Sequence, residues 1–213
     1  MKDVVEVSET FVSIQGESTH AGLPCFFVRL AGCNLRCSYC DTEYARSGGR
    51  RMNVAEIISM ARESGVEMVE ITGGEPLLQA GTPVLIEALC DEGFRVLVET
   101  NGSMRIDSID PRAVAVLDIK TPGSGMSAEM SYENLRMLRP HDEVKFVITD
   151  RADYLWARDV IGEFGLAGGR TLFSPSAGLL APEELAGWML EDRLPVRLNL
   201  QIHKYLFGDR RGV

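Results

Sequence analysis

Short runs of apolar, β-branched residues alternate along the chain with longer stretches in which apolar residues recur every three or four positions. The short runs predict strands, and several are apolar at successive positions, as strands buried on both faces are. The longer stretches predict amphipathic helices. We expect strands at residues 25–30, 68–72, 95–99, 113–119, 144–148, 171–173 and 196–200, and helices at 54–63, 84–92, 132–138, 152–164 and 182–190.

The alternation of the two element types indicates the fold class. Strand–helix–strand units imply right-handed crossovers and a mainly parallel sheet. Roughly six units are too few for a closed barrel of eight, so we expect an α/β fold with an open or partial barrel in one domain, residues 1–213. Its ligands would bind at the carboxyl ends of the strands. Asn53 with Glu56 predicts a capping box, and Gly65 and Gly93 are expected to follow helix ends.

Composition and charge narrow the range of partners. Hydrophobic residues make up 45% of the 213 residues, and the formal net charge is −9. Such an acidic chain is poorly suited to non-specific binding of nucleic acid or of an anionic membrane. The N-terminal segment has no signal-peptide pattern, and no apolar run approaches the roughly 18 residues of a membrane span. We therefore expect a cytoplasmic protein that binds neither nucleic acid nor membrane directly.

Three of the five cysteines, Cys33, Cys37 and Cys40, directly follow the first predicted strand with the spacing CxxxCxxC. In a reducing compartment such a group indicates metal ligation. Three thiolates can hold three irons of a [4Fe–4S] cluster and leave the fourth iron open, as a catalytic centre requires. A zinc site usually needs four ligands, which the histidines do not complete, and burial in the core fits poorly with the polar neighbours of these cysteines. Cys25 and Cys90 lie in apolar runs and are expected to pack in the core.

Small and polar residues follow four of the predicted strands. The sequence TGGEP at 72–76 contains two glycines, which can take positive φ and let the backbone approach a ligand closely. ETNG at 99–102, DIKT at 118–121 and SPSAG at 174–178 end three other strands. Each segment could be an ordinary turn or a solvated loop. Their shared position at strand ends favours a ligand site.

Two further features indicate a polar cavity. SIQGES at 13–18 places Gln, Gly and Glu between apolar stretches, and it forms either a loop over the cleft or a plain surface turn. Arg29 lies in the apolar run 26–30, where an unpaired charge is costly. We expect Arg29 to point into the cavity and to bind a substrate carboxylate through two parallel hydrogen bonds. The alternative is an internal salt bridge, for instance to Glu17.

The motif CxxxCx(aromatic)C, with Tyr39 as the aromatic residue, followed by GGEP resembles the radical S-adenosylmethionine (SAM) superfamily. With SIQGES, AGLPCFFVRLAGCNLRCSYCDTEYA and LNLQIHKYLFG, it resembles the 7-carboxy-7-deazaguanine synthase family over essentially the whole chain. The resemblance implies a partial (β/α)6-type radical SAM barrel. It also implies a lyase that converts 6-carboxy-5,6,7,8-tetrahydropterin to 7-carboxy-7-deazaguanine and ammonia in queuosine biosynthesis. The implied cofactors are a [4Fe–4S] cluster, SAM and Mg²⁺.

The same resemblance implies roles for individual residues. Cys33, Cys37 and Cys40 would hold the cluster, and Thr42 would bind Mg²⁺, a hard cation that prefers oxygen ligands. The SAM-binding residues would be Tyr39, Cys40, Asp41, Gly74, Asp118, Ile119, Lys120, Ser174, Pro175, Ser176 and Ala177. The substrate-binding residues would be Ile14, Gln15, Gly16, Glu17, Arg29, Thr72, Glu99 and His203, with His203 at the end of the last strand. A homodimer and an electron donor such as flavodoxin are also implied.

Other functions of the same motifs remain open at this point. An activase of the same superfamily, which abstracts hydrogen from a glycine of a partner protein, would share CxxxCxxC, but it would need an open groove for a polypeptide. A cluster used for electron transfer or structure would leave GGEP without a purpose. A direct role on nucleic acid is disfavoured by the net charge of −9.

Overall fold

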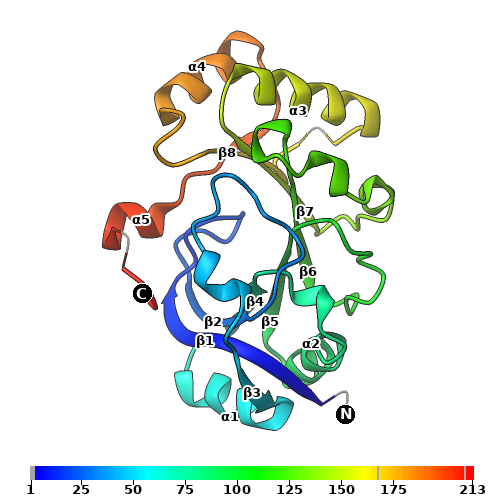
Figure 1. The fold of residues 1–213 in the computed structure, drawn as a ribbon, viewed down its shortest axis with the longest axis vertical. Helices are drawn as coiled ribbons and strands as arrows, with labels where there is room; N and C mark the ends of the chain where they lie inside the picture. The colour runs from blue at the N-terminus through cyan, green and yellow to red at the C-terminus, as the bar shows by residue number, and fades with distance from the viewer. Residues whose placement is uncertain (1–2, 167, 209) are drawn as a thin grey trace.

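A computed structural model describes residues 3–166, 168–208 and 210–213, and the strands in this part of the chain form one sheet (Figure 1). Its nine strands follow the order β3-β1-β2-β4-β5-β6-β7-β8-β9. The parallel strands are β2 (Pro24–Leu30), β4 (Met68–Gly73), β5 (Arg95–Thr100), β6 (Val114–Ile119), β7 (Glu143–Ile148), β8 (Thr171–Pro175) and β9 (Arg197–Leu198). β1 (Val4–Ile14) runs antiparallel to both β2 and β3 (Arg50–Asn53). The expected partial barrel with a mostly parallel sheet is confirmed.

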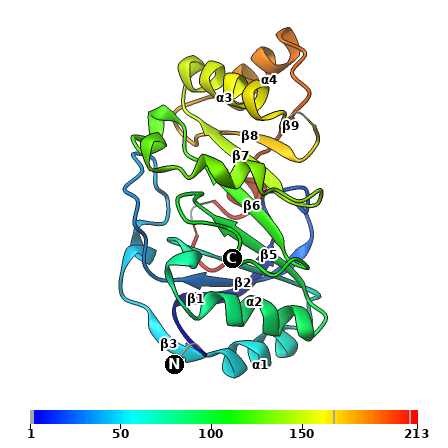
Figure 2. The same cartoon turned by 90° about the vertical axis from the view of Figure 1, so that its right-hand side faces the viewer.

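Helices cover the outer face of this sheet (Figure 2). They are α1 (Val54–Ser64), α2 (Thr82–Asp91), α3 (Arg151–Phe164) and α4 (Pro182–Glu191), all close to their predicted ranges. In Figure 2, α1 and α2 lie over the half of the sheet that contains β1 to β5, and α3 and α4 lie over the half that contains β7 and β8. None of the helices in the described part of the chain is both long and apolar enough to cross a bilayer.

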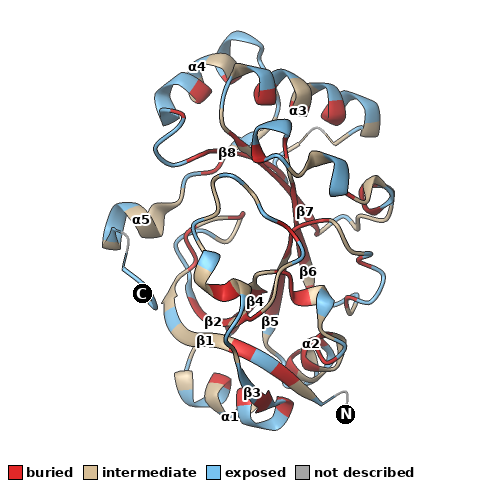
Figure 3. Ribbon diagram, in the orientation of Figure 1, coloured by how far each residue is buried: buried red, intermediate tan, exposed pale blue. Residues whose placement is uncertain are grey.

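The central strands are largely buried (Figure 3), and their two faces differ in chemistry. On β4, Val69 and Ile71 pack in the main hydrophobic core beneath the helices. Glu70 and Thr72 alternate with them and line an internal cavity, because successive side chains of a strand point to opposite faces. The outer face of the sheet, beneath the helices, is therefore apolar, and the inner face supplies polar side chains to the cavity.

The loop between β1 and β2 closes the amino-terminal end of the barrel. Ile14 at the end of β1 pairs with Pro24 at the start of β2, so the loop leaves the sheet where the parallel strands begin. The loop then reaches β7, where the backbone N–H of Thr19 donates to both oxygens of Glu143 at 3.2 and 3.1 Å. SIQGES thus borders the interior from the end opposite to the carboxyl ends of the strands.

Several predictions about local structure are confirmed and others are wrong. Gly65 ends α1 with φ of 71°, and Gly93 follows α2 with φ of +85°. The capping box is wrong: the side chain of Asn53 makes no capping hydrogen bond, since Asn53 is also the last residue of β3. Cys25 is fully buried as expected, and Cys90 is partly buried against the core.

Most of the differences between the predicted and the observed elements fall in segments that have few buried residues. The predicted helix 132–138 is only the 3₁₀ turn η5 (Tyr132–Arg136), and the predicted strand 196–200 is reduced to β9. His203 lies on a short helix, α5 (Ile202–Phe207), and not at a strand end. α5 was not predicted because none of its residues is buried, and β1 and β3 were not predicted because their apolar patterns are interrupted by charges. The 3₁₀ turns are η1 (Glu43–Arg46), η2 (Pro76–Leu78), η3 (Pro122–Ser124), η4 (Ser127–Glu129) and η5 (Tyr132–Arg136).

Candidate active site

One cavity of about 530 Å³ runs through the interior of the partial barrel. It extends from the cysteine loop, at the carboxyl end of β2, to residues 14–18 at the opposite end of the barrel. All the residues predicted to bind the cluster, Mg²⁺, SAM or substrate line this cavity, with one exception. The exception is Ile119, whose side chain is fully buried in the hydrophobic core. The structure therefore brings the predicted residues together, while their individual roles stay predictions.

Backbone hydrogen bonds fix the cysteine loop to its neighbours. Gly32 N donates to Ala45 O at 2.8 Å, and Ser38 N donates to Ser124 O at 3.0 Å. Cys33, Cys37 and Cys40 are all free thiols, partly buried at the cavity wall. Burial raises the pKa of Cys37, while the positive charge of Lys120 acts in the opposite direction.

The arrangement of the thiols suits a cluster better than a single ion. Among the described residues, no three His, Cys, Asp or Glu side chains converge closely enough to hold one metal ion. A [4Fe–4S] cluster needs no such convergence, because each thiolate binds a different iron. Three free thiols on one loop at the wall of a polar cavity therefore fit a cluster that is open on one side.

Gly73 and Gly74 let the end of β4 approach the cysteine loop closely. Gly73 has φ of +145°, a conformation that disfavours other residues. A Cβ at Gly74 would overlap the carbonyl oxygen of Gly32 and lie 2.7 Å from Cys33 Cβ. The two glycines were expected to let the backbone approach a ligand closely. In the structure they let the end of β4 pack directly against the cysteine loop.

Glu75, the acidic residue of GGEP, is fully buried and joins the ends of two strands. Its carboxylate accepts hydrogen bonds from Leu77 N at 2.9 Å, Thr100 Oγ1 at 2.8 Å and Asn101 N at 2.7 Å. These bonds connect the turn after β4 to the end of β5. Glu75 therefore positions the rim of the cavity and does not line it.

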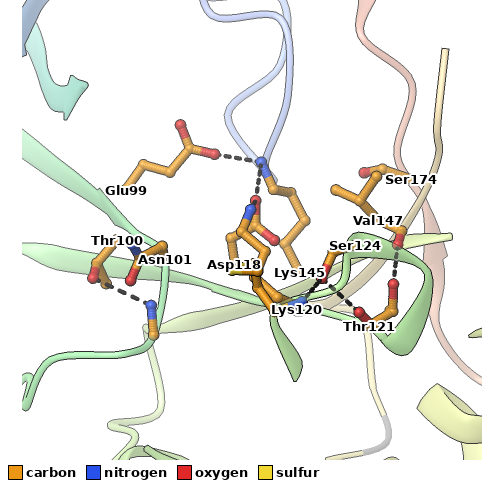
Figure 4. Close-up of polar contacts among 12 residues, drawn as sticks. Glu99, Thr100, Asn101, Asp118, Lys120, Thr121, Ser124, Lys145, Val147 and Ser174 are labelled. Carbon is orange, nitrogen blue, oxygen red and sulfur yellow. Dashed lines mark hydrogen bonds and ion pairs between the residues drawn. The ribbon is translucent and has the colours of Figure 1, made fainter. Parts of the chain in front are cut away.

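A buried cation, Lys145 on β7, joins carboxylates from three elements, and Figure 4 shows two of them, Glu99 and Asp118. Its Nζ lies 2.7 Å from Glu17 of the β1–β2 loop, 3.4 Å from Asp118 of β6, and in contact with Glu99 of β5. Lys120 Nζ, 2.8 Å from Asp118, adds a second cation. Burial by itself would lower the pKa of Lys145, but the three carboxylates outweigh it and hold this pKa well above its ordinary value.

Sequence reasoning missed Lys145 and Glu70, although a usable signal was present. Each is a charged residue inside an apolar strand run, as Arg29 is. The same argument that placed Arg29 at a polar cavity would have placed both of them there. Glu70 is 4% exposed and lines the cavity floor beside Gln15.

Arg29 contacts a different carboxylate from the one suggested by the sequence. Its Nε lies 2.8 Å from Glu9 Oε1 on β1, and Tyr44 also donates to this oxygen at 2.8 Å. Glu17 instead pairs with Lys145. The salt-bridge alternative for Arg29 thus holds with Glu9 as the partner, while the guanidinium still lines the cavity.

His203 lies on α5 and contacts the β1–β2 loop. We call residues 15–23 the floor loop, because they close the cavity at the end away from the cysteine loop. A Cβ at Gly16 would lie 2.7 Å from His203 Cγ, so only glycine leaves room for this ring. Ile202 N also donates to Gly16 O at 3.0 Å. Burial lowers the pKa of His203, against the opposing charge of Glu17. These contacts favour a neutral imidazole at the cavity wall.

Four buried polar atoms at the cavity lack a hydrogen-bond partner among the described residues. They are Ser13 Oγ, Tyr39 Oη, Arg46 Nε and Asp118 Oδ1. Buried polar groups are nearly always hydrogen-bonded in native proteins. A ligand with polar groups along its length would satisfy these atoms.

Comparisons with known proteins agree with this geometry. Residues 28–120 match the radical SAM superfamily. The chain is 49% identical to a 7-carboxy-7-deazaguanine synthase of Chlorobaculum tepidum, over 98% of this chain and 97% of that protein. It is 43% identical to a synthase of the same name from Koribacter versatilis, over 98% of this chain and 100% of that protein. The crystal structure of QueE from Escherichia coli has a similar fold, with a TM-score of 0.76 at 19% identity, over 93% of this chain and 94% of that chain.

Proposed function

Because the chain belongs to the 7-carboxy-7-deazaguanine synthase family of radical SAM enzymes, we propose that its cavity converts 6-carboxy-5,6,7,8-tetrahydropterin to 7-carboxy-7-deazaguanine and ammonia. One observation carries this proposal: the thiols of the cysteine loop and the charged residues below them line the same cavity of about 530 Å³. A volume of this order suits a small polar ligand. The two products together contain the same atoms as the substrate, so the conversion needs no net oxidant.

The residues at the cysteine loop fit the implied cofactors. Cys33, Cys37 and Cys40 would hold the [4Fe–4S] cluster. Thr42 would bind Mg²⁺, and it lines the cavity next to the cysteine loop. When bound, these groups and SAM supply a radical that takes a hydrogen atom from carbon and a Lewis acid for oxygen ligands.

SAM would lie between the cysteine loop and the carboxyl ends of the neighbouring strands. Gly74 exposes backbone there, and Asp118 and Lys120 form a charged pair that can bind the amino and carboxylate groups of a zwitterion. Tyr39 to Asp41 and Ser174 to Ala177 border the same end of the cavity. Ile119 is excluded as a side-chain contact by its place in the core, so any contribution from it would come from the backbone.

The pterin would occupy the part of the cavity below SAM. Arg29 uses Nε for Glu9, which leaves the two terminal nitrogens of the guanidinium for a carboxylate of the substrate. Thr72 donates to Glu99 at 3.0 Å and borders the same space. Gln15, Gly16 and His203 would close the lower end. Positioning of the substrate carbon beside the radical source is the main task of this chain in such a reaction.

The activase alternative is not favoured. The relatives named as synthases match this chain over nearly their whole length. In addition, the loop from β1 to β2 closes the cavity at its amino-terminal end through the contacts of Thr19 with Glu143. A polypeptide substrate would need a groove that stays open.

The enzyme takes a small-molecule substrate and needs an electron donor, as radical SAM enzymes do. We infer that a flavodoxin supplies the electron, that the enzyme works as a homodimer, and that it acts in the cytoplasm. Exposed apolar side chains on α5, with Tyr205 at 92% and Leu206 at 54% exposure, leave surface for a partner chain. Size measurement of the purified holoenzyme tests the dimer, and a stable monomer would contradict it.

Mass analysis of the reaction product tests the proposed function. The protein, reconstituted with iron and sulfide, is incubated with SAM, dithionite and carboxytetrahydropterin. We expect 7-carboxy-7-deazaguanine and one ammonia per product, and neither from the Cys33→Ala variant. Cleavage of SAM to 5′-deoxyadenosine with the pterin recovered unchanged would overturn the proposed substrate.

A further inference from the structure

The floor of the cavity contains a carboxyl group without a counter-ion. Glu70 on β4 is 4% exposed and lines the cavity. Within the described residues it takes part in no ion pair, whereas Glu9 and Glu17 at the same cavity each contact a cation. A buried carboxyl group in this situation either keeps its proton or requires donors from a ligand.

The charges that act on Glu70 come from three strands and from the β1–β2 loop. Burial raises its pKa well above the ordinary value, and the charges of Glu99 on β5 and Glu17 on the floor loop act in the same direction. Lys145 on β7 and Arg29 on β2 act against this rise, but they are engaged with other carboxylates. The thiol of Cys25 on β2 also faces it.

Gln15 fixes the orientation of the Glu70 carboxyl group. Gln15 Nε2 donates to Glu70 Oε2, and Gln15 Oε1 accepts from Glu17 N at 2.6 Å. The two bonds set which end of the Gln15 amide faces Glu70. The backbone of Gln15 is held in turn by its own hydrogen bonds to Leu23 and Gly22, both of 2.8 Å. The hydrogen bond from Gln15 engages Oε2 of Glu70, so Oε1 remains for a ligand.

Glu70 lies at the end of the cavity away from the cysteine loop. It precedes Thr72 by two residues on a strand that runs toward that loop, which places it roughly 6–7 Å deeper. A pterin whose carboxylate lies near Arg29 and whose reacting carbon lies near the radical source would direct its pyrimidine ring toward this floor. That ring carries adjacent N–H donors at its 2-amino group and at N3.

We propose that Glu70 is a specificity-determining residue that accepts hydrogen bonds from the 2-amino and N3–H groups of the pterin ring. The inference rests on the proposed function and extends it to the part of the substrate that does not react. A carboxylate is the acceptor that best matches two parallel N–H donors. Glu70 thereby selects 2-amino-4-oxopyrimidine rings over rings that present an oxygen at position 2.

A comparison of two ligands in two proteins tests this proposal. The ligands are the stable analogue 6-carboxypterin and its 2-oxo counterpart 6-carboxylumazine, and their binding to the SAM-loaded protein is measured by calorimetry. The wild-type protein should prefer the pterin by roughly 10- to 100-fold, the range of a charge-assisted hydrogen bond. Glu70→Gln, which keeps the size and can still accept from Gln15, should reduce this preference to a few-fold.

Glu143→Gln is the matched control. Glu143 is also fully buried and also contacts the floor loop, through Thr19, but it does not line the cavity. If Glu143→Gln shifts the floor loop, it should weaken the binding of both ligands equally. The preference for 6-carboxypterin should then stay as in the wild type. An unchanged preference in Glu70→Gln, or an equal loss of preference in Glu143→Gln, would overturn the role of Glu70.

Proton release provides a second measurement that needs no variant. Glu70 should lose its proton when it accepts from the N–H donors of the pterin. Calorimetry of the wild-type protein at mildly acidic pH, in two buffers with different ionisation enthalpies, should show proton release with 6-carboxypterin and not with 6-carboxylumazine. Equal proton release with both ligands would contradict the proposal. If neither ligand binds, the proposed function itself fails, a result distinct from binding without preference.

Discussion

Lys145 and Glu17 lie 128 positions apart in the chain, yet Lys145 Nζ is 2.7 Å from Glu17 Oε2 inside the barrel. The pair joins the β1–β2 loop to β7, and Lys145 extends the connection to Glu99 and Asp118. One cation therefore links the floor of the cavity to the wall where SAM is proposed to bind. Removal of a single partner from a buried network of this kind leaves the remaining charges without compensation.

Lys145→Met should destabilise the protein strongly. Three carboxylates would lose their shared cation, so we expect the free energy of unfolding to fall by about 3–5 kcal/mol. Chemical denaturation of the apo-protein measures this change. The control is Lys204→Met, which removes a more exposed pair with Asp41 and should cost about 0–1 kcal/mol. Equal losses in the two variants would contradict the network.

Gly74→Ala should disturb the cysteine loop, because the added Cβ would overlap the carbonyl oxygen of Gly32. We expect a loss of about 1–3 kcal/mol in stability and weaker SAM binding, measured by denaturation and by calorimetry. Gly187→Ala is the control: Gly187 lies in the middle of α4 and a Cβ there meets nothing within 4 Å. It should stabilise the protein by about 0.5–1 kcal/mol. The explanation is wrong if Gly74→Ala binds SAM like the wild type.

Alanine at Cys33, Cys37 or Cys40 should abolish the cluster. We expect iron content and the absorbance of the reconstituted protein to fall to background in each variant, because each thiol is needed as a ligand. Cys90→Ala should retain both, since burial raises the pKa of Cys90 to about 11 and keeps it a thiol at neutral pH. Normal iron content in any of the three loop variants would refute the assignment.

Glu70→Gln should change how stability depends on pH. The pKa of Glu70 is raised in the folded state, so the folded protein binds this proton more tightly than the unfolded chain. The wild type should therefore lose stability as the pH rises from the ordinary glutamate range to the raised pKa. The variant lacks this loss and should melt at a higher temperature than the wild type in alkaline buffer, with the difference shrinking toward acid. A difference that does not vary with pH would show that Glu70 is ionised throughout.

The sequence predicted the parallel strands well for a physical reason. Strands such as β4 and β6 are covered on one side by helices and are apolar enough to form a recognisable run. β1 was missed because only Val5 and Val7 of its eleven residues are buried. α5 was missed because its stabilising contacts, such as Lys204 with Asp41, join distant parts of the chain.

The sequence predicted most of the residues that line the candidate site, but it did not predict which side chains form ion pairs with each other. The motifs identified the residues that line the cavity, since each motif follows a strand or closes the barrel. Partners were not predictable, because Arg29 could reach either Glu9 or Glu17 and only the register of β1 with β2 decides for Glu9. Glu70 and Lys145 carried the same signal as Arg29, a charge inside an apolar strand run, but their partners depend on the three-dimensional arrangement that brings Gln15 and Glu17 to them.

The central claim is that the cysteine loop and the pterin site share one cavity, so that a hydrogen atom can pass directly from the substrate to SAM. The most direct measurement uses substrate deuterated at C6 with the reconstituted enzyme, SAM and dithionite, followed by mass analysis of the 5′-deoxyadenosine. We predict that deuterium appears in the 5′-deoxyadenosine formed during turnover. Unlabelled 5′-deoxyadenosine accompanying normal formation of the deazaguanine product would contradict direct transfer from C6.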